Sequence, residues 1–338
     1  MSKSKQIAVV GAGSWGTALA LALSRKGHQV SLWDYDSDHI QTLAGARVNN
    51  RYLPDHPFPD TLVPEKSLKV CVQNKQIILM VVPTHGFRSV FEQIANVLET
   101  RVAIVSASKG VENETLLTMS QIMTEIVTSY GKQETVELAV LSGPSFAKEV
   151  ANQTPTAVTI GCKDSETACD LQETFNTQSL RVYSSSDLIG LEISAALKNI
   201  VAIAAGICDG LRYGTNTRAA LITRGLAEIA RFGIHFGAET ETFYGLSGMG
   251  DLVLTCTGDL SRNRTVGLKL GQGKGLEQIL EEMSMVAEGV KTTKSVYDLS
   301  QKLSIEMPIT EQVYEILYKG KNCSLAVKDL LSRELKPE

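Results

Sequence analysis

The order of strand-like and helix-like segments constrains the fold more than any other feature of this sequence. Through the first half, short apolar runs alternate with amphipathic stretches, a pattern typical of βαβ units around a mostly parallel sheet. The expected strands are Gln6–Val10, Gln29–Trp33, Gln76–Val82, Arg101–Ser106, Glu137–Leu141, Ala157–Cys162 and Leu180–Tyr183, and the expected helices between them include Ser14–Lys26, Thr115–Tyr130 and Ser165–Phe175. The stretch Tyr52–Pro64 is interpreted as an ordered loop.

The strand pattern stops after Ser186, and only helical patterns follow. The expected helices are Asp187–Asp209, Thr215–Phe236, Asp251–Cys256, Arg262–Leu270, Glu288–Lys302, Ile309–Tyr318 and Leu325–Leu335. A serine triplet precedes the first of them, so we place a domain boundary there. We expect an α/β domain over residues 1–186, followed by an all-α domain over residues 187–338.

Composition excludes several classes of protein. Hydrophobic residues make up 43% and charged residues 21%, as in a soluble globular protein, which excludes a disordered or collagen-like chain. The net charge of −4 gives no general attraction for nucleic acid. The six cysteines include no C-x-x-C pair and no histidine at metal-ligand spacing, so we expect reduced thiols in the core and no metal centre.

No segment is expected to enter a membrane or to direct export. The N-terminus lacks the apolar stretch and cleavage site of a signal peptide, which favours a cytoplasmic location. The most apolar long segment, Leu188–Leu211, contains Glu192, Lys198 and Asp209, and a charge at mid-bilayer costs about 3 kcal/mol. We therefore interpret this segment as a helix buried in protein.

A glycine-rich turn connects the first expected strand to the first expected helix. In Gly11-Ala-Gly13-Ser-Trp-Gly16, the first glycine permits a tight turn, the second lets backbone N–H groups approach a pyrophosphate, and the third lets helix and strand pack closely. This context predicts a Rossmann-like dinucleotide-binding domain. Asp34, at the end of the second expected strand, is placed to accept a hydrogen bond from an adenosine ribose. A solvated turn residue is the alternative for Asp34.

One lysine stands in an almost wholly apolar helical segment. Lys198 lies within Ile193–Gly206, with small residues one turn away on either side. Partial desolvation lowers the pKa of a lysine toward neutrality, which suits a general acid or base. The alternative is a lysine that reaches the surface or pairs with a structural carboxylate such as Glu192.

Three further polar segments are candidates for a ligand site. Asp251 follows Gly248-Met-Gly and begins a helix, and we favour capping of that helix over contact with Lys198. Ser261-Arg-Asn-Arg264 is interpreted as a helix start able to bind a phosphate, with a solvated basic turn as the alternative. Lys109 follows an apolar run at the sheet edge where α/β proteins bind ligands, and a surface lysine is the alternative.

These residues lie in segments through which the chain resembles the NAD(P)-dependent glycerol-3-phosphate dehydrogenases, in particular the bacterial soluble type. The segments are Gly11–Ala18, Ser142–Val150, Ala196–Ala202, Asp209–Asn216, Gly245–Asp251 and Ser261–Asn263. The lysine and Ser-Arg-Asn segments together are specific to this family, whereas many dehydrogenases share the glycine-rich turn. The resemblance implies reversible hydride transfer between NAD(H) or NADP(H) and dihydroxyacetone phosphate, giving sn-glycerol 3-phosphate for phospholipid synthesis.

The resemblance also implies roles for individual residues. Lys198 is the general acid for ketone reduction and the base for alcohol oxidation, Asn199 supports it, and Lys109 and Asp251 complete the polar shell around the substrate carbonyl. The substrate-binding residues are expected to be Lys109, Gly143, Ser145, Lys198, Asp251, Ser261, Arg262 and Asn263. The cofactor-binding residues are expected to be Gly11, Gly13, Ser14, Trp15, Gly16, Asp34, Lys109, Ala147, Arg262, Val286 and Glu288.

Several alternatives stay open at this point. The choice between NADH and NADPH is one, because members that prefer NADP often carry a basic or neutral residue where this chain has Asp34. A related β-hydroxyacid or ketopantoate-type dehydrogenase is a second enzyme hypothesis, against which Ser261–Asn263 and Ser142–Ser145 argue. A redox-sensing protein that binds the dinucleotide without chemistry would have no use for Lys198. We allow for a homodimer, although the sequence itself does not give the oligomeric state.

Overall fold

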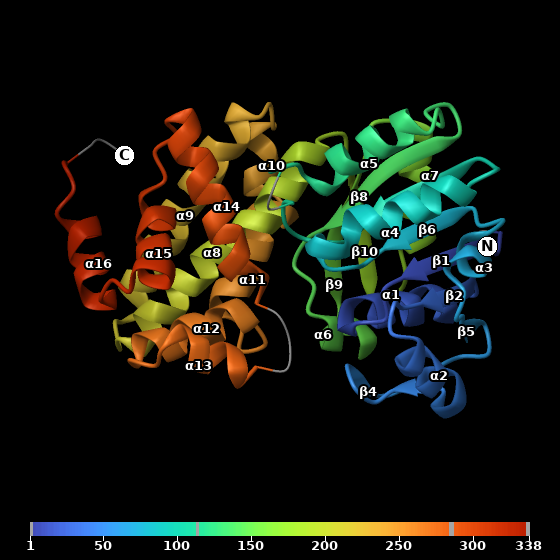
Figure 1. Cartoon of the computed structure of the whole chain (residues 1–338), viewed down its shortest axis with the longest axis horizontal. Coiled ribbons are helices and arrows are strands. Elements are labelled where there is room, and N and C mark those ends of the chain that lie inside the picture. Colours follow the sequence, from blue (N-terminus) through green and yellow to red (C-terminus); the bar gives the residue numbers. More distant parts are fainter. Residues whose placement is uncertain (1–2, 113–114, 284–286, 336–338) are drawn as a thin grey trace. The chain divides into compact units, whose positions relative to one another are not determined.

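The computed structural model describes residues 3–112, 115–283 and 287–335, and the chain forms two compact units (Figure 1). The first unit comprises residues 1–109 and 117–191, and the second comprises residues 110–116 and 192–338.

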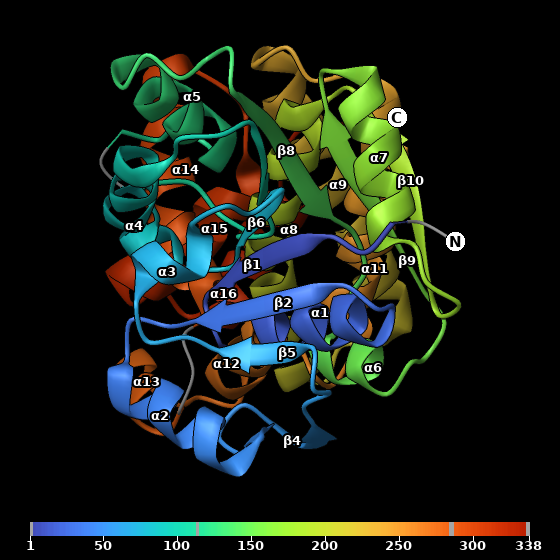
Figure 2. The ribbon, with the colours of Figure 1, turned by 90° about the vertical axis from the view of Figure 1, so that its right-hand side faces the viewer.

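The first unit is built around an eight-stranded sheet, several strands of which are seen in Figure 2. The strand order is β10-β9-β8-β7-β6-β1-β2-β5, and neighbouring strands are parallel except for the antiparallel pair β8 and β9. Two further strands, β3 and β4, form a separate antiparallel pair. The strands are β1 Gln6–Val10, β2 Gln29–Trp33, β3 Val48–Asn49, β4 Leu53–Pro57, β5 Leu62–Pro64, β6 Ile77–Met80, β7 Val102–Ser106, β8 Val136–Ser142, β9 Thr156–Cys162 and β10 Leu180–Ser185.

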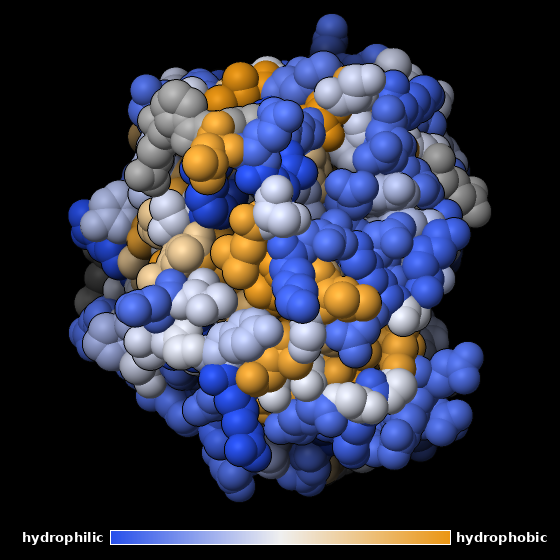
Figure 3. Space-filling model, turned by 90° about the vertical axis from the view of Figure 1, so that its left-hand side faces the viewer, coloured by the Kyte–Doolittle hydropathy of each residue, from blue (hydrophilic) through white to orange (hydrophobic). Residues whose placement is uncertain are grey.

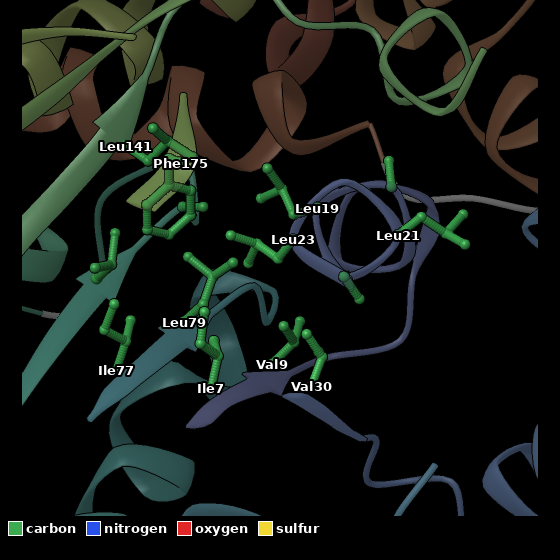
Figure 4. Close-up of a cluster of buried hydrophobic side chains, with 14 of the residues drawn as sticks. Ile7, Val9, Leu19, Leu21, Leu23, Val30, Ile77, Leu79, Leu141 and Phe175 are labelled. Atoms are coloured by element: carbon green, nitrogen blue, oxygen red, sulfur yellow. The ribbon is translucent and has the colours of Figure 1, made fainter. Parts of the chain in front are cut away.

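Helices cover both faces of this sheet, because successive side chains of a strand point to opposite sides. The helices of the first unit are α1 Ser14–Arg25, α2 Ser37–Ala46, α3 Leu68–Val72, α4 Thr84–Val97, α5 Met119–Ser129, α6 Ala147–Ala151 and α7 Ser165–Phe175. In β1, Ile7 and Val9 belong to the core cluster that includes residues of α1 and α7. Figure 4 shows these two side chains beside Leu23 of α1. Ala8 and Val10 belong instead to the cluster with α4 and α5.

The order of the strands places a topological switch point at β1. The chain passes from β1 to β2 on one side, and β6 pairs with β1 on the other side. In open α/β sheets, ligands bind outside the carboxyl ends of the strands at such a point. The glycine-rich turn that follows Val10 lies at this position.

The second unit is helical. Its elements are α8 Leu188–Gly210, whose first turn lies in the first unit, α9 Thr215–His235, α10 Thr240–Tyr244, the π-helix η1 Leu246–Gly250, α11 Asp251–Thr257, α12 Arg262–Gly271, α13 Leu276–Glu281, α14 Glu288–Leu303, α15 Pro308–Lys319 and α16 Cys323–Leu331. Helix α8 is long and apolar enough to cross a membrane by composition, but 89% of its most apolar window is buried inside the protein. Helix α8 is therefore apolar because it is buried in protein, as the charged residues within it predicted.

This architecture confirms the predicted fold class, an α/β Rossmann-like domain with a mostly parallel sheet followed by helices. One prediction was wrong: Tyr52–Pro64 is not wholly a loop, because it contains β4 and β5. Both strands are short and carry proline, so their strand signal is weak. The helix expected from Thr115 begins at Met119, since Thr118 and Gln121 form a capping box that fixes its start.

Candidate active site

The glycine-rich turn has the backbone geometry that its sequence predicted. Gly11 has a φ of +114°, and a Cβ there would lie 2.3 Å from the carbonyl oxygen of Val81. A Cβ on Gly16 would lie 1.9 Å from the carbonyl oxygen of Gly11, so the helix and the turn pack as closely as backbones allow. A Cβ on Gly13 would meet nothing within 4 Å. The turn therefore leaves open space beside Gly13, at the start of α1.

The N-terminus of α1 offers backbone donors. Gly13 is the N-cap residue, no side chain caps the helix, and its first turn contains no acidic residue. The Ser14 hydroxyl donates a hydrogen bond to the Tyr52 carbonyl at 2.8 Å. Trp15 packs against the core, and its buried indole N–H has no partner among the described residues. These features suit the binding of an anionic ligand at the helix start.

Two side chains form hydrogen bonds with the middle residue of the glycine-rich turn. The Ala12 N–H donates to Oδ2 of Asp34 at 2.7 Å, and the Ala12 carbonyl accepts from Nδ2 of Asn49 at 2.8 Å. The other oxygen of Asp34 accepts from the Asp36 N–H at 3.1 Å. Asp34 is thus bound to the turn rather than freely solvated. Asn49 is fully buried, and sequence reasoning missed it because its partner lies far along the chain.

Three predicted substrate residues meet at one carbonyl group in the first unit. The Gly143 carbonyl accepts from the Lys109 ammonium at 3.3 Å and from the Ser145 hydroxyl at 3.0 Å. Gly143 has a φ of +135°, a conformation that residues with a side chain rarely adopt, and a Cβ there would lie 3.0 Å from the Cα of Val158. Ala147 begins the short helix α6 and packs against the core beside α1.

The second unit holds a buried charged cluster around Lys198. Lys198 on α8 and Asp251 on α11 are 6% and 1% exposed, and Nζ lies 3.0 Å from Oδ1 of Asp251. The Lys198 ammonium also donates to the hydroxyl of Thr255 at 2.8 Å. Lys198 therefore does not reach the surface, and its partner in this ion pair is Asp251. Thr255 was missed by sequence reasoning; its signal is its spacing of one helical turn from Asp251.

The prediction that Asp251 caps a helix was wrong. The π-helix η1 runs directly into α11, and Gly250 before Asp251 already has helical dihedral angles, φ −60° and ψ −52°. There is consequently no free helix start to cap, and no side-chain cap is formed at α11. The carboxylate of Asp251 turns instead to Lys198. π-Helical segments are frequent at functional sites.

The start of α12 agrees with the helix start predicted at Ser261. Ser261 is the N-cap residue, and its hydroxyl accepts from the Arg264 N–H at 3.2 Å. Arg262 is exposed in the first turn, and Asn263 is 8% exposed. Arg264 is held by an ion pair with Asp209 at the end of α8. Basic and amide groups at a helix start are suited to bind a phosphate.

Glycines hold α8 and α12 at backbone contact. A Cβ on Gly206 would lie 2.0 Å from the Arg264 carbonyl oxygen, and a Cβ on Gly267 would lie 1.9 Å from the Ile203 carbonyl oxygen. Gly210 and Gly271 repeat the arrangement one turn further on. Because the helices cannot come closer, this contact fixes the spacing between Lys198 on α8 and the start of α12.

The remaining predicted residues lie near these elements or outside the described chain. Asn199 is 5% exposed and follows Lys198 on α8. Glu288 is the first residue of α14 and is half-buried. Val286 lies outside the described residues.

The first unit carries a glycine-rich turn at the switch point of a Rossmann-like sheet, and the second, helical unit carries a buried lysine. This combination is typical of dinucleotide-dependent dehydrogenases with two domains. Family models described as "NAD-dependent glycerol-3-phosphate dehydrogenase" match this sequence, the N-terminal model over residues 6–168 and the C-terminal model over residues 187–328. The chain belongs to this family.

Relatives named "Glycerol-3-phosphate dehydrogenase [NAD(P)+]" match along the whole chain. The protein from Desulfotalea psychrophila is 57% identical over 98% of both chains, and that from Geobacter sulfurreducens is 50% identical over 99% of both. A crystal structure of glycerol-3-phosphate dehydrogenase from Coxiella burnetii is 45% identical, with a TM-score of 0.91, over 98% of this chain and 99% of that one.

The alternative of a ketopantoate-type dehydrogenase shares the fold alone. A ketopantoate reductase from Ralstonia eutropha is 15% identical, with a TM-score of 0.58, over 96% of this chain and 99% of that one. The sequence relationship with the glycerol-3-phosphate dehydrogenases is much stronger.

Proposed function

We propose that this protein interconverts dihydroxyacetone phosphate and sn-glycerol 3-phosphate with NAD(H) or NADP(H), and that it supplies glycerol 3-phosphate for phospholipid synthesis. The family to which the chain belongs supports the reaction. Residues 1–186 bind the dinucleotide, and residues 187–338 carry the acid–base group and most of the substrate contacts.

The glycine-rich turn binds the dinucleotide. The support is the geometry of the turn: α1 begins without a side-chain cap, and the space beside Gly13 is open. Gly11, Gly13, Ser14, Trp15 and Gly16 lie at the pyrophosphate. Further cofactor contacts come from Asp34, Lys109, Ala147, Arg262, Val286 and Glu288.

The nicotinamide, when bound, supplies or accepts the hydride at C2 of the substrate. During reduction, the Lys198 ammonium donates a proton to the carbonyl oxygen, so that the ketone becomes a secondary alcohol and Lys198 becomes a neutral amine. During oxidation, the neutral amine takes the hydroxyl proton back. General acid–base catalysis of this kind contributes roughly 10²–10⁴-fold to a rate.

Asp251 and Thr255 orient the Lys198 ammonium. The support is the pair of contacts at 3.0 and 2.8 Å, which hold the ammonium against these two side chains. Asn199 supports the same helix turn, and Lys109 contributes to the polar surroundings of the substrate carbonyl.

The start of α12 holds the substrate phosphate. Ser261, Arg262 and Asn263 lie at the first turn of a ten-residue helix, where backbone N–H groups, a guanidinium and an amide are available. Gly143 and Ser145 also contact the substrate. Fixing the phosphate places the reacting carbon at a constant position, which raises the rate by lowering the entropy cost of alignment.

The observation that carries this proposal is the buried Lys198–Asp251 pair, and replacing Lys198 tests it. We expect Lys198→Met to lose roughly 10²–10⁴-fold in kcat while NADH still binds, as measured by cofactor fluorescence. Lys198→Arg retains a positive charge for Asp251, and we expect it to be comparably inactive. Lys302→Met, at an exposed position of α14, is the matched control and should keep full activity. Near-native kcat in both Lys198 variants would overturn the assignment.

A homodimer in the cytoplasm is the proposed state of the protein. Figure 3 shows apolar side chains gathered on the face that carries the C-terminal helices. Leu325 and Leu331 on α16 are 53% and 81% exposed. Burying these side chains against a second copy of the chain would remove apolar surface from water, which favours a dimer. The six cysteines are unpaired, as expected in a reducing compartment, although Cys169 is exposed and so is not the core thiol that was predicted. Light scattering of the purified protein measures the oligomeric state.

A further inference from the structure

One backbone N–H group in α14 is joined to the proposed phosphate site. Gly289, the second residue of α14, donates this N–H to Oδ1 of Asn263 at 3.0 Å, and the bond is buried. The N-cap residue of α14 is Ala287, which has no side-chain acceptor, so the helix start needs an acceptor from elsewhere. Asn263, at the start of α12, provides it.

Only glycine fits at position 289. A Cβ there would lie 2.7 Å from Oδ1 of Asn263 and 2.9 Å from the carbonyl oxygen of Asn199. The carbonyl belongs to the backbone of α8, directly after Lys198, and cannot move without moving that helix. A larger residue at 289 therefore presses on both groups, and the Asn263 side chain is the one that can move.

The bond determines which way the Asn263 amide faces. An N–H donor requires the carbonyl oxygen of the amide, so Oδ1 faces α14 and Nδ2 faces away from it. Within the described chain, no residue accepts a hydrogen bond from Nδ2, and Nδ2 is not fully enclosed. Its two N–H groups are consequently available to an acceptor outside the protein.

We propose that Gly289 is a positioning residue for the substrate phosphate: its backbone N–H fixes the Asn263 amide so that Nδ2 donates to a phosphate oxygen. This inference rests on the proposed function, since it takes the start of α12 as the phosphate site. Without the Gly289 bond, the amide is free to rotate and to present Oδ1, an acceptor, to the anion. Glu288, a proposed cofactor residue, directly precedes Gly289 in α14. The hydrogen bond between Gly289 and Asn263 therefore connects the proposed phosphate site to a proposed cofactor residue.

The test is Gly289→Ala, assayed with dihydroxyacetone phosphate and with inorganic phosphate as a competitive inhibitor. We expect the KM for dihydroxyacetone phosphate and the inhibition constant for phosphate both to rise about tenfold, the loss expected for one misaligned charge-assisted hydrogen bond. kcat at saturating substrate should change less than threefold. Gly275→Ala, where a Cβ meets nothing within 4 Å, is the matched control and should leave both constants unchanged.

A double-mutant comparison separates positioning from a general structural effect. In an Asn263→Ala background, Gly289→Ala should raise the KM less than twofold further, because the side chain that it displaces is absent. An equal effect of Gly289→Ala in both backgrounds would overturn the positioning role while leaving the phosphate site intact. An unchanged KM in Asn263→Ala alone would overturn the phosphate site itself, and this inference with it.

A second variant tests the orientation of the amide without adding bulk. Asn263→Asp keeps an acceptor for the Gly289 N–H but replaces both Nδ2 donors with an anionic oxygen. We expect a KM raised more than that of Asn263→Ala, since the carboxylate repels phosphate. Far-ultraviolet circular dichroism checks that the variant is folded. A KM below that of Asn263→Ala would show that the donor side does not face the anion.

Discussion

At the scale of single residues, the Lys198–Asp251 pair shows how tightly the proposed chemistry depends on local charge. Both side chains are almost fully buried, and removing one partner of such a pair costs about 3–5 kcal/mol, because an uncompensated charge is left. Thr255 reduces this cost by accepting from Lys198 at 2.8 Å.

Asp34 is the residue at which we expect cofactor choice to be made. Its carboxylate accepts from Ala12 and Asp36, so it is held beside the glycine-rich turn and cannot rotate away into water. A 2′-phosphate at this position would face a fixed negative charge. We expect Asp34→Asn to raise the NADPH-to-NADH ratio of kcat/KM several-fold, measured at low salt where screening is weakest.

Two results distinguish the roles of Asp34. An Asn side chain keeps one oxygen for the Ala12 N–H, so the turn should stay intact and NADH use should fall only slightly. If the ratio stayed constant while activity with both cofactors fell, Asp34 would serve only to hold the turn.

Some site residues could be predicted from the sequence, and others could not. The turn glycines were predictable because their constraint is local: a strand, a tight turn and a helix follow within a few residues. Lys198 was predictable because a charge in an apolar helix stands out. Asn49 gave no such signal, since it matters through a partner brought to it by folding. Thr255 has only a weak signal, its spacing of one helical turn from Asp251, because its contact with Lys198 also depends on folding.

At the scale of elements, the contact between α8 and α12 connects helix packing to the site. Gly267 lies against the Ile203 carbonyl of α8, so a methyl group there would push the helices apart. We expect Gly267→Ala to lower the free energy of unfolding by about 2 kcal/mol or more, measured by urea denaturation.

The same variant should alter substrate binding, because Ser261–Asn263 move with α12. We expect a raised KM for dihydroxyacetone phosphate together with the loss of stability. The control Gly275→Ala adds the same methyl group in open space and should leave both quantities close to those of the natural chain. A stable Gly267→Ala protein with normal kinetics would show that the helices can separate without consequence.

Elements with strong, uniform patterns were predicted almost to the residue, as β1, β2 and α7 illustrate. α2, α3, α4, α6, α10 and α13 were not individually predicted from the sequence. α3, α6, α10 and α13 have only five or six residues, too few to show a helical period, and tertiary packing stabilises such short helices. The π-helix η1 likewise has no sequence signature of its own.

At the scale of the whole molecule, one buried carboxylate connects the stability of the fold to pH. Glu228 on α9 is 3% exposed and accepts from the backbone N–H groups of Ile309 and Thr310 and from the Thr310 hydroxyl. It thereby caps α15, whose own N-cap residue, Met307, forms no side-chain cap. Burial raises the pKa of Glu228 to about 7, although these hydrogen bonds and Arg231 act to lower it.

The direction of the stability change follows from this raised pKa. In the unfolded chain, Glu228 loses its proton near the ordinary pKa of 4.5, whereas the folded protein keeps the proton until about pH 7. The contribution of Glu228 to stability is therefore complete below pH 4.5 and is lost as the pH rises to about 7. The difference in pKa corresponds to about 3 kcal/mol, since each pKa unit is worth about 1.4 kcal/mol.

Glu228→Gln should remove this dependence, because an amide does not titrate. We expect the natural chain to lose stability relative to Glu228→Gln by about 3 kcal/mol between pH 4.5 and pH 8, measured as the difference in free energy of unfolding in urea at each pH. Comparing the two chains at the same pH cancels the titration of all other groups. Glu277→Gln, at an exposed position of α13, should follow the natural chain at every pH. If the natural chain and Glu228→Gln showed parallel pH profiles, the cap of α15 would be an ordinary ionised carboxylate throughout this range, and burial would not outweigh its three hydrogen bonds.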